Sequence, residues 1–368
     1  MYQRHNLFGR TYPPPLLYSV SYSKSGGGLI RGRPYRLQLT SCFALRKLSA
    51  HLIYKVMVKK FIIAIDVGGT NLKVALLGPG YNIRDRRILS TRRFIKKEKL
   101  IEAIASSVSN LVISHRLKKQ DILGIGLGLP GPVDLKNGIV HFLPNLPGWK
   151  EVRLKDILQK KLKLPVFLDN DVNLMSLAEY KRGAARGSRN SVCLTLGTGV
   201  GGGIIIDGSI YRGRDNATGE IGHLPINEKG PRCNCRGIAC LETYVGNNAI
   251  LRDAKRLFGR NISLEELSRL AQKGNPKARS LWSKVALRLG VALVGVVNLL
   301  NPDCIVIGGG VANSGKALFD KLRQTVKQRA MVIQGRRVKI VKAKLGGDAG
   351  IIGAAIMVKE GLRNKHAA

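Results

Sequence analysis

The sequence predicts an α/β protein built from two similar lobes. From residue 61 onward, short apolar strands alternate with amphipathic helices, strand hairpins occur in two separate places, and a glycine-rich turn connects the strands of each hairpin. A chain of 368 residues is long enough for two domains or for one fold with two lobes. We therefore expect two α/β lobes rather than one purely parallel sheet.

The first 56 residues differ from the rest of the chain. They hold runs of proline and glycine, Pro13–Pro15 and Gly26–Gly28, and nine Lys or Arg with no acidic residue. This composition predicts disorder and also resembles an organellar transit peptide. Met57, directly before the first strand, equally fits the true start of translation. We leave residues 1–56 out of the fold prediction.

The first lobe is expected over residues 57–178. Apolar spacing predicts strands at 61–66, 72–77, 122–128 and 164–168, and helices at 100–112 and 172–182. The second lobe is expected over residues 179–347, with strands at 192–196, 203–206, 304–307 and 338–341 and helices at 264–272 and 277–300. A final helix is expected within residues 348–368.

Composition restricts the class of partner. Lys and Arg number 62 against 23 Asp and Glu, giving a formal charge of +39. This excess alone would suggest an anionic partner, but no nucleic-acid motif accompanies it, so we expect a solvated basic surface rather than nucleic-acid binding. The sequence holds no uninterrupted apolar run of membrane-spanning length, so no membrane association is expected.

Two glycine-rich turns carry a phosphate-binding pattern. Successive backbone N–H groups in such turns can cradle phosphate oxygens, although an ordinary hairpin turn is the alternative for each. Asp66 at the strand end could hold Mg²⁺ through water. The expected phosphate-binding residues are Asp66, Gly68, Gly69, Thr70, Asn71 and Lys73 in the first turn and Gly197, Thr198 and Gly199 in the second. One turn per lobe predicts that a polyphosphate is clamped from both sides.

Between the turns, Asn170 and Asp171 end a strand and open a helix. Asp171 could be a simple helix N-cap. If both phosphate turns face it, Asp171 is placed to accept a proton from an attacking hydroxyl while Asn170 binds the sugar that carries this hydroxyl.

A compact group of possible metal ligands follows the second turn. Three of the six cysteines lie within eight residues, which in a chain without a clear secretory signal favours metal binding in a reducing cytoplasm over disulfides. We expect structural Zn²⁺ on His223, Cys233, Cys235 and Cys240, with reduced free thiols as the alternative. Such a metal would orient Glu220, His223 and Glu242 without taking part in chemistry.

With these residues, the chain over roughly residues 61–360 resembles the ROK family of repressors and sugar kinases, and among them the glucokinases. The resemblance implies an α/β actin-like ATPase (ribonuclease H-like) fold, two lobes with an interlobe cleft, and a last helix that returns to the first lobe. It also implies a homodimer, ATP contacts at Gly309 and Gly310, and hexose contacts at Asn145, Asn170, Asp171, Glu220, His223 and Glu242.

The cysteine loop departs from the family pattern. Arg236 and Ala239 stand where family members usually have glycine. We expect Gly237 to supply the conformational freedom that the turn needs, one residue later.

The expected activity is ATP-dependent phosphorylation of a hexose, glucose to glucose 6-phosphate, with Asp171 deprotonating the C6 hydroxyl. N-acetylmannosamine, fructose or another hexose as acceptor, and polyphosphate as donor, remain open because the motifs are shared. A sugar-responsive repressor is the alternative from another class. Such repressors carry a winged helix-turn-helix ahead of the kinase-like part, and residues 1–56 do not supply that pattern.

Overall fold

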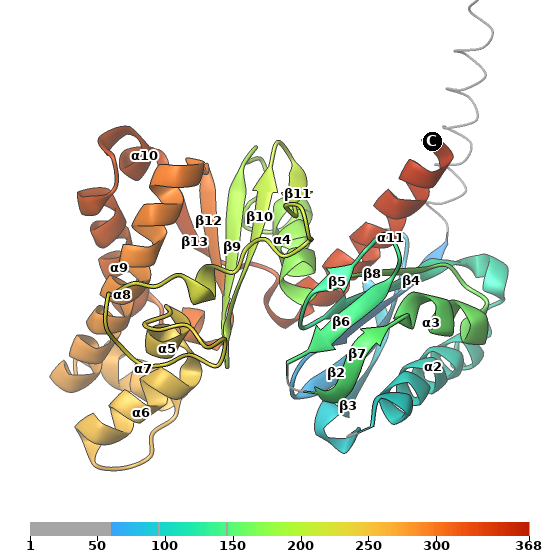
Figure 1. Cartoon of the computed structure of the whole chain (residues 1–368), viewed down its shortest axis with the longest axis horizontal. Coiled ribbons are helices and arrows are strands. Elements are labelled where there is room, and N and C mark those ends of the chain that lie inside the picture. Colours follow the sequence, from blue (N-terminus) through green and yellow to red (C-terminus); the bar gives the residue numbers. More distant parts are fainter. Residues whose placement is uncertain (1–59, 95, 145, 368) are drawn as a thin grey trace, which may run out of the picture. The chain divides into compact units, whose positions relative to one another are not determined.

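The computed structural model describes residues 60–94, 96–144 and 146–367, which contain two five-stranded sheets of identical topology (Figure 1). In the first, three antiparallel strands are followed by two parallel ones in the order β3-β2-β1-β4-β8, and the second repeats this as β11-β10-β9-β12-β13. The strands are β1 (Phe61–Val67), β2 (Asn71–Leu77), β3 (Ile83–Ser90), β4 (Ile122–Leu129) and β8 (Val166–Asn170), then β9 (Ser191–Leu196), β10 (Val200–Ile206), β11 (Ser209–Tyr211), β12 (Cys304–Gly308) and β13 (Lys339–Lys342). The expected pair of similar lobes is confirmed.

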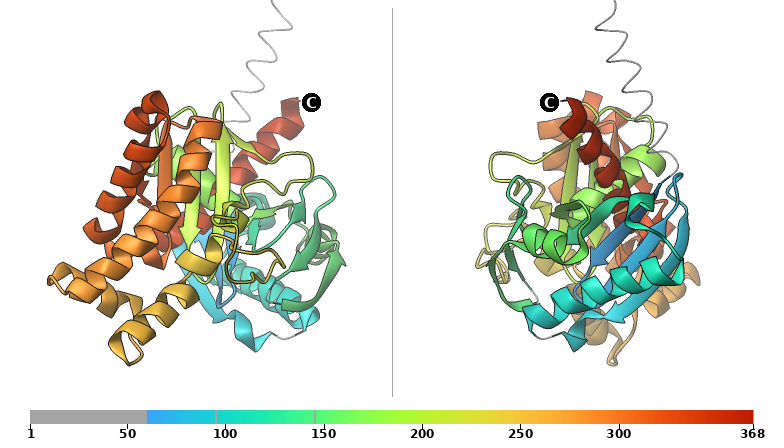
Figure 2. Two further views of the ribbon diagram at one scale, coloured as in Figure 1. Left: turned by 60° about the vertical axis from the view of Figure 1, so that its left-hand side comes forward. Right: turned by 90° about the vertical axis from the view of Figure 1, so that its right-hand side faces the viewer.

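Alternation along β1 builds both faces of the first lobe. Ile63 and Ile65 point into one cluster with helix α2 (Lys97–Ser114), whereas Ile62 and Ala64 point into another with helix α11 (Ala349–Ala367). Figure 2 shows the two helices on opposite faces of this sheet. A strand buried on both faces must be apolar at almost every position, which β1 is.

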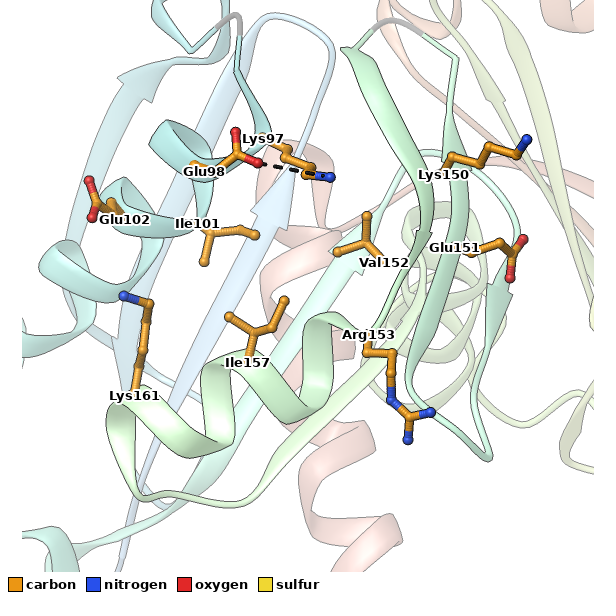
Figure 3. A pocket seen from close by; sticks show the side chains of 10 residues that line it. All are labelled: Lys97, Glu98, Ile101, Glu102, Lys150, Glu151, Val152, Arg153, Ile157 and Lys161. Carbon is orange, nitrogen blue, oxygen red and sulfur yellow. Dashed lines mark ion pairs between the residues drawn. The ribbon is translucent and has the colours of Figure 1, made fainter.

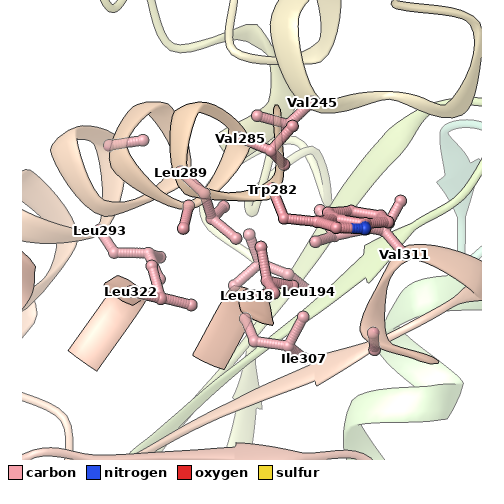
Figure 4. Packing of buried hydrophobic residues seen from close by; sticks show 14 of the residues in the cluster. Leu194, Val245, Trp282, Val285, Leu289, Leu293, Ile307, Val311, Leu318 and Leu322 are labelled. Carbon is pink, nitrogen blue, oxygen red and sulfur yellow. The ribbon is translucent and has the colours of Figure 1, made fainter. Parts of the chain in front are cut away.

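The second lobe is organised around helix α8 (Pro276–Leu300). Asn275 caps its first turn and Asn301, in the left-handed conformation, ends it before Pro302. Trp282 and Leu289 are fully buried against strand residues such as Ile307 (Figure 4). The helix is long and apolar enough to cross a membrane, with a mean hydropathy of 1.7, and this packing in the core accounts for its composition. The other helices here are α5 (Glu242–Val245), α6 (Asn247–Phe258), α7 (Leu264–Gln272), α9 (Lys316–Arg329) and α10 (Val332–Arg337).

Helices α4 (Asp171–Arg182) and α11 occupy equivalent positions, each following the last parallel strand of a sheet. Helix α4 packs on β9 and β10 as well as on β4 and β8, and α11 packs on β1, β4 and β8. The two helices also pack on each other, so closely that a side chain at Gly353 would collide with the carbonyl oxygen of Leu174. The lobe boundary expected at residue 178 falls inside α4.

A small third sheet was not expected. It consists of β5 (Val133–Asp134), β6 (Ile139–Leu143) and β7 (Leu146–Val152), and helix α3 (Leu154–Leu162) follows. Pro147 and Gly148 look like a turn in the sequence, but β7 is an edge strand, where proline costs no ladder hydrogen bond. Asn145 and residues 1–56 lie outside the described residues, so the expectations made for them are not addressed by the structure.

Candidate active site

The carboxyl ends of the parallel strands bring the acidic residues of the first lobe to one edge. Asp66 on β1 is in register with Gly128 on β4, and Gly128 is in register with Asp169 on β8. Because parallel strands all end at the same edge, Asp66 and the segment from Asp169 to Asp171 lie at that edge. More than a hundred residues separate Asp66 from Asp169 in the sequence, and the pairing of β1 with β4 and of β4 with β8 brings them to the same edge.

Asp171 is the first residue of α4, and its carboxylate is half-buried. Burial and the nearby negative charges of Asp66 and Glu220 raise the pKa of Asp171 to about 7, against a hydrogen bond from the backbone N–H of Val172 that lowers it. The N–H of Val172 lies 2.9 Å from Asp171 Oδ1. A carboxylate with this pKa can take up and release a proton near neutral pH.

Asn170, not Asp171, caps helix α4. Its side-chain oxygen accepts hydrogen bonds from the backbone N–H groups of Val172 at 2.9 Å and Asn173 at 3.2 Å. The alternative that Asp171 serves as the N-cap is therefore wrong. The side-chain amide of Asn170 also donates to the carbonyl oxygen of Gly131 at 3.3 Å, which fixes its orientation.

Asp169 fixes the junction between the end of β8 and the start of α4. Its carboxylate is almost fully buried, at 1% exposure, and accepts hydrogen bonds from the Asn173 side chain and from the guanidinium of Arg212. Arg212 follows β11 in the second lobe, so this buried ion pair ties the strand end of the first lobe to the segment that leads to Glu220. Sequence reasoning missed Arg212, and no local pattern marks it.

The first glycine-rich turn is open to solvent at Gly69, Thr70 and Asn71. A hydrogen bond within the turn fixes its shape, because the N–H of Gly68 donates to the carbonyl of Asn71 at 2.9 Å. The Lys73 ammonium lies 3.2 Å from the Asp66 carboxylate and donates to the carbonyl of Gly347 at 2.8 Å. The structure thus places Lys73 and Asp66 beside the start of α11.

The second glycine-rich turn, at Thr198 and Gly199, is also exposed. A side chain on Gly199 would lie 2.7 Å from the Glu242 carboxylate, so Glu242 would have to move to make room for it. Gly309, with φ of 83°, packs directly on the backbone of Leu196 at the end of β9. The segments 197–199 and 309–310 therefore lie together at one end of the second sheet.

Glu242 connects this turn to the cysteine cluster. One carboxylate oxygen accepts from the backbone N–H of Val200 at 2.8 Å, and the other lies 4.0 Å from the sulfur of Cys233. On the other side of the cluster, His223 directs Nδ1 at Cys233 Sγ, 3.6 Å away, and Nε2 at the Glu220 carboxylate, 3.8 Å away. Glu220, His223 and Glu242 are thus brought together around the cluster.

The cluster itself fits a tetrahedral metal. One ligand atom from each of His223, Cys233, Cys235 and Cys240 lies within 4.8 Å of all the others. Four such atoms around one ion at bond lengths of about 2.0–2.3 Å match the donor set of structural Zn²⁺. Burial and the neighbouring thiols raise the pKa of Cys240 to about 12, and a cation at the centre is the group that would stabilise the thiolate.

The loop around the cluster keeps its shape without the usual glycines. Arg236 has a φ of 74° and Ala239 a φ of 55°, both in the left-handed region. The prediction that Gly237 supplies the turn is wrong, since the two substituted residues adopt the strained conformation themselves. Hydrogen bonds between Cys233 and Gly237 and between Ala239 and Pro231 hold the loop closed.

A profile of the ROK family matches residues 62–361. The chain belongs to the ROK family. The ROK relatives include a protein named glucokinase from Halalkalibacterium halodurans, which is 35% identical over 321 residues covering 83% of this chain and 96% of the relative. A ROK xylose repressor from Caldicellulosiruptor bescii is 31% identical over 310 residues, covering 81% of this chain and 77% of the repressor.

Solved ROK structures support the same assignment. The crystal structure of a ROK family glucokinase from Streptomyces griseus in complex with glucose and AMPPNP superposes with a TM-score of 0.70 at 30% identity, covering 82% of this chain and 99% of that one. The paired sheets and the likeness to ROK kinases confirm the actin-like ATPase fold. The resemblance inferred from motifs is confirmed as well.

A cavity of about 430 Å³ lies elsewhere in the first lobe, between α2, β7 and α3 (Figure 3). Ile101, Val152 and Ile157 form its apolar floor, and Lys150 and Lys161 lie at its rim with Glu102. None of the expected site residues lines it. Its mixture of charges of both signs selects no particular ligand.

Proposed function

We propose that this protein phosphorylates a hexose with ATP, with glucose converted to glucose 6-phosphate as the leading reaction. The observation that carries the proposal is Asp171, a half-buried carboxylate with a pKa near 7 at the edge that also holds Asp66. A carboxylate in this state is suited to accept a hydroxyl proton. The glucokinase relatives, and the relative solved with glucose and AMPPNP, support the choice of substrates.

The proposed reaction moves one proton and one phosphoryl group. Asp171 accepts the proton of the C6 hydroxyl, the freed oxygen forms a bond to the γ-phosphorus of ATP, and the bond from that phosphorus to the β–γ bridging oxygen breaks to release ADP. Asn170, Glu220, His223 and Glu242 hold the sugar. The exposed residues 69–71 and 198–199 supply backbone N–H groups to the phosphates, while the N–H groups of Gly68 and Gly197 hold the turns in shape. Gly309 and Gly310 lie near the nucleotide.

Two metals belong to the proposal. Mg²⁺ would neutralise phosphate charge, and Asp66 is the carboxylate at the phosphate turn that fits it, through water, with Lys73 adjacent. Zn²⁺ on His223, Cys233, Cys235 and Cys240 would be structural, since all four positions of a tetrahedral ion are taken by protein atoms. Zinc bound through Nδ1 would fix the His223 ring and leave its Nε2 facing the Glu220 carboxylate.

We also propose a homodimer that works in a reducing cytoplasm. None of the five cysteines of the described residues is in a disulfide, and the two outside the proposed zinc site, Cys193 and Cys304, are buried thiols, which supports a reducing compartment. Light scattering of the purified chain measures the oligomeric state, and a monomer at micromolar concentration would contradict this part of the proposal.

A coupled assay that detects ADP tests the reaction, with a panel of glucose, fructose and N-acetylmannosamine crossed with ATP. Glucose with ATP is expected to give the highest kcat/KM. A polyphosphate arm uses glucose and detects glucose 6-phosphate, and ATP is expected to be the better donor. No turnover with any sugar or donor in zinc-loaded, Mg²⁺-supplemented protein would contradict the proposed function.

A sugar-responsive repressor is the second candidate, favoured by the match to the xylose repressor. It predicts sequence-selective DNA binding that weakens with sugar and with salt. Binding to random genomic fragments, sequenced after selection, separates the two candidates. Recovery of one enriched sequence would favour the repressor, and uniform recovery would favour the kinase.

A further inference from the structure

Four of the five most exposed large apolar side chains in the described part of the chain gather at one end of the second lobe. They are Leu299 at 83% exposure, Met331 at 63%, Val332 at 61% and Ile333 at 65%. Single exposed apolar residues are ordinary on protein surfaces, but a contiguous group is the mark of an interaction surface. We name these four residues the apolar tip.

The apolar tip is one patch in space. The backbone N–H of Met331 donates to the side chain of Asn298 at 2.9 Å, which fixes the start of α10 against the last turn of α8, where Leu299 is the next residue. Figure 1 shows α10 at this end of α8 and α9. The Gly335 N–H in turn donates to the carbonyl of Met331 at 2.8 Å, so α10 presents three consecutive apolar side chains from a folded turn.

The surroundings of the apolar tip are strongly basic. Residues 316–344 contain ten Lys or Arg and one acidic residue, Asp320. Within the described part of the chain, Arg323 is the one member of this set that forms an ion pair, with Asp320 at 3.4 Å. The exposed cations that lie nearest in sequence to the tip are Lys327, Arg329, Arg336 and Arg337. These four exposed cations flank the tip on both sides in the sequence, and none of them forms an ion pair with a described acidic side chain.

The sequence predicts no membrane association, but on these exposed side chains we propose that the apolar tip and its flanking cations dock this protein on the surface of an anionic lipid membrane. Apolar side chains that enter the headgroup layer, flanked by Lys and Arg that meet anionic headgroups, are the pattern of a peripheral membrane contact. A second copy of the chain fits this surface less well, because a symmetric contact here would bring together two copies of a segment with ten Lys or Arg and one acidic residue, so the proposed homodimer is expected to use another face. Nucleic acid fits less well because the tip offers no aromatic ring for base stacking.

Co-sedimentation with phosphatidylcholine vesicles, with and without about one third phosphatidylglycerol, tests the proposal on the full chain. The wild type should bind the anionic vesicles only, and binding should weaken as salt shortens the Debye length. Arg336→Ala/Arg337→Ala should lower the partition coefficient about 25-fold, from about fivefold per cation removed. Val332→Ser/Ile333→Ser should lower it about tenfold by removing the inserted apolar groups.

Matched variants separate the proposed surface from the general basicity of the chain. Lys160→Ala/Lys161→Ala removes two exposed cations of α3, and Ile113→Ser removes an apolar side chain that is 72% exposed on α2. Both should bind anionic vesicles within about twofold of the wild type, and all variants should keep wild-type kcat, which shows that they fold. Equal loss in tip and control variants would overturn the proposal. So would a change from dimer to monomer in Val332→Ser/Ile333→Ser without loss of vesicle binding.

Discussion

Arg236 and Ala239 show what single residues contribute to the cysteine loop. A left-handed backbone costs a side-chain-bearing residue about 1–2 kcal/mol relative to glycine, partly offset by the greater entropy that glycine loses on folding. The loop tolerates this strain because Cys233 and Ala239 are held by backbone hydrogen bonds and the cluster sits at its centre. The strain is local, so it can be relieved without changing the site.

Arg236→Gly, at an exposed position, is therefore expected to stabilise the zinc-loaded protein by about 0.5–1 kcal/mol. Ala239→Gly should gain less, because it also removes a fully buried methyl group from the core. Urea unfolding measures the gain. Arg232→Gly, in the same loop but without a positive φ, is the control and should destabilise slightly. Lower stability of both glycine variants at positions 236 and 239 would contradict the strain account.

At the same scale, the pKa of Asp171 sets a pH dependence. The pKa is raised to about 7, so the carboxylate is protonated below that pH and can no longer accept the hydroxyl proton. We expect kcat/KM for the hexose to fall about tenfold for each pH unit below about 7 and to level off above it. Mg²⁺ bound near Asp66, as proposed, would offset part of the negative charge and would shift this fall in kcat/KM to lower pH. A flat profile from about pH 5 to 8 would contradict Asp171 as the base.

At the scale of elements, Glu179 ties α4 to the segment that enters α11. The side chain is fully buried and accepts backbone N–H groups from Ala184 at 2.7 Å, Lys344 at 3.1 Å and Leu345 at 2.8 Å. Helix α4 carries Asp171 at its other end, and α11 begins beside Asp66. The Glu179 carboxylate thus holds together α4, which carries Asp171, and the segment that leads into α11, which begins beside Asp66.

Glu179→Ala removes a fully buried side chain and leaves three partly buried N–H groups without their acceptor, so it is expected to lower the free energy of unfolding by about 3 kcal/mol. Glu179→Gln keeps one acceptor oxygen and should lose less. Denaturant unfolding compares both with Glu265→Ala, an exposed carboxylate on α7 whose loss should change stability by less than about 0.5 kcal/mol. Equal stability of the alanine variants would refute this role.

The proposed zinc site of His223, Cys233, Cys235 and Cys240 acts at the scale of a loop. Cys235→Ser should reduce zinc below about one ion per chain and raise the KM for the hexose more than it lowers kcat, because Glu220, His223 and Glu242 lose their support. Metal analysis and steady-state kinetics measure both effects. Cys304→Ala, a buried thiol outside the cluster, should keep full zinc. An unchanged KM for the hexose in a zinc-free Cys235→Ser variant would contradict the proposal that zinc supports the sugar-binding residues.

Much of this arrangement could be predicted because it is encoded locally. The apolar periods of β1, β9 and α8, the two glycine turns and the cysteine spacing are each read from a few adjacent residues. The third sheet was missed because β7 opens with Pro147 and Gly148, which are turn residues elsewhere. The pairing of Asp169 with Arg212 was missed because it depends on how β8 and β11 are brought together, and local sequence does not encode that.

At the scale of the whole molecule, two sheets of the same topology each present a glycine-rich turn, and α4 and α11 connect the sheets to each other. Neither sheet alone holds the full set of proposed groups. Asp66 and Asp171 come with the first sheet, whereas Gly199, Glu220 and Glu242 come with the second lobe. The proposed kinase chemistry therefore requires both.

Phosphorus NMR of the product formed from ATP and glucose by the wild type and by Asp171→Asn tests this account most directly. The wild type should yield a phosphate coupled to the C6 protons, and Asp171→Asn should yield less than about one thousandth as much per unit time while it keeps its fold and zinc. Phosphate on another sugar oxygen, or product formation by Asp171→Asn at the wild-type rate, would contradict the assignment of Asp171 as the base for the C6 hydroxyl.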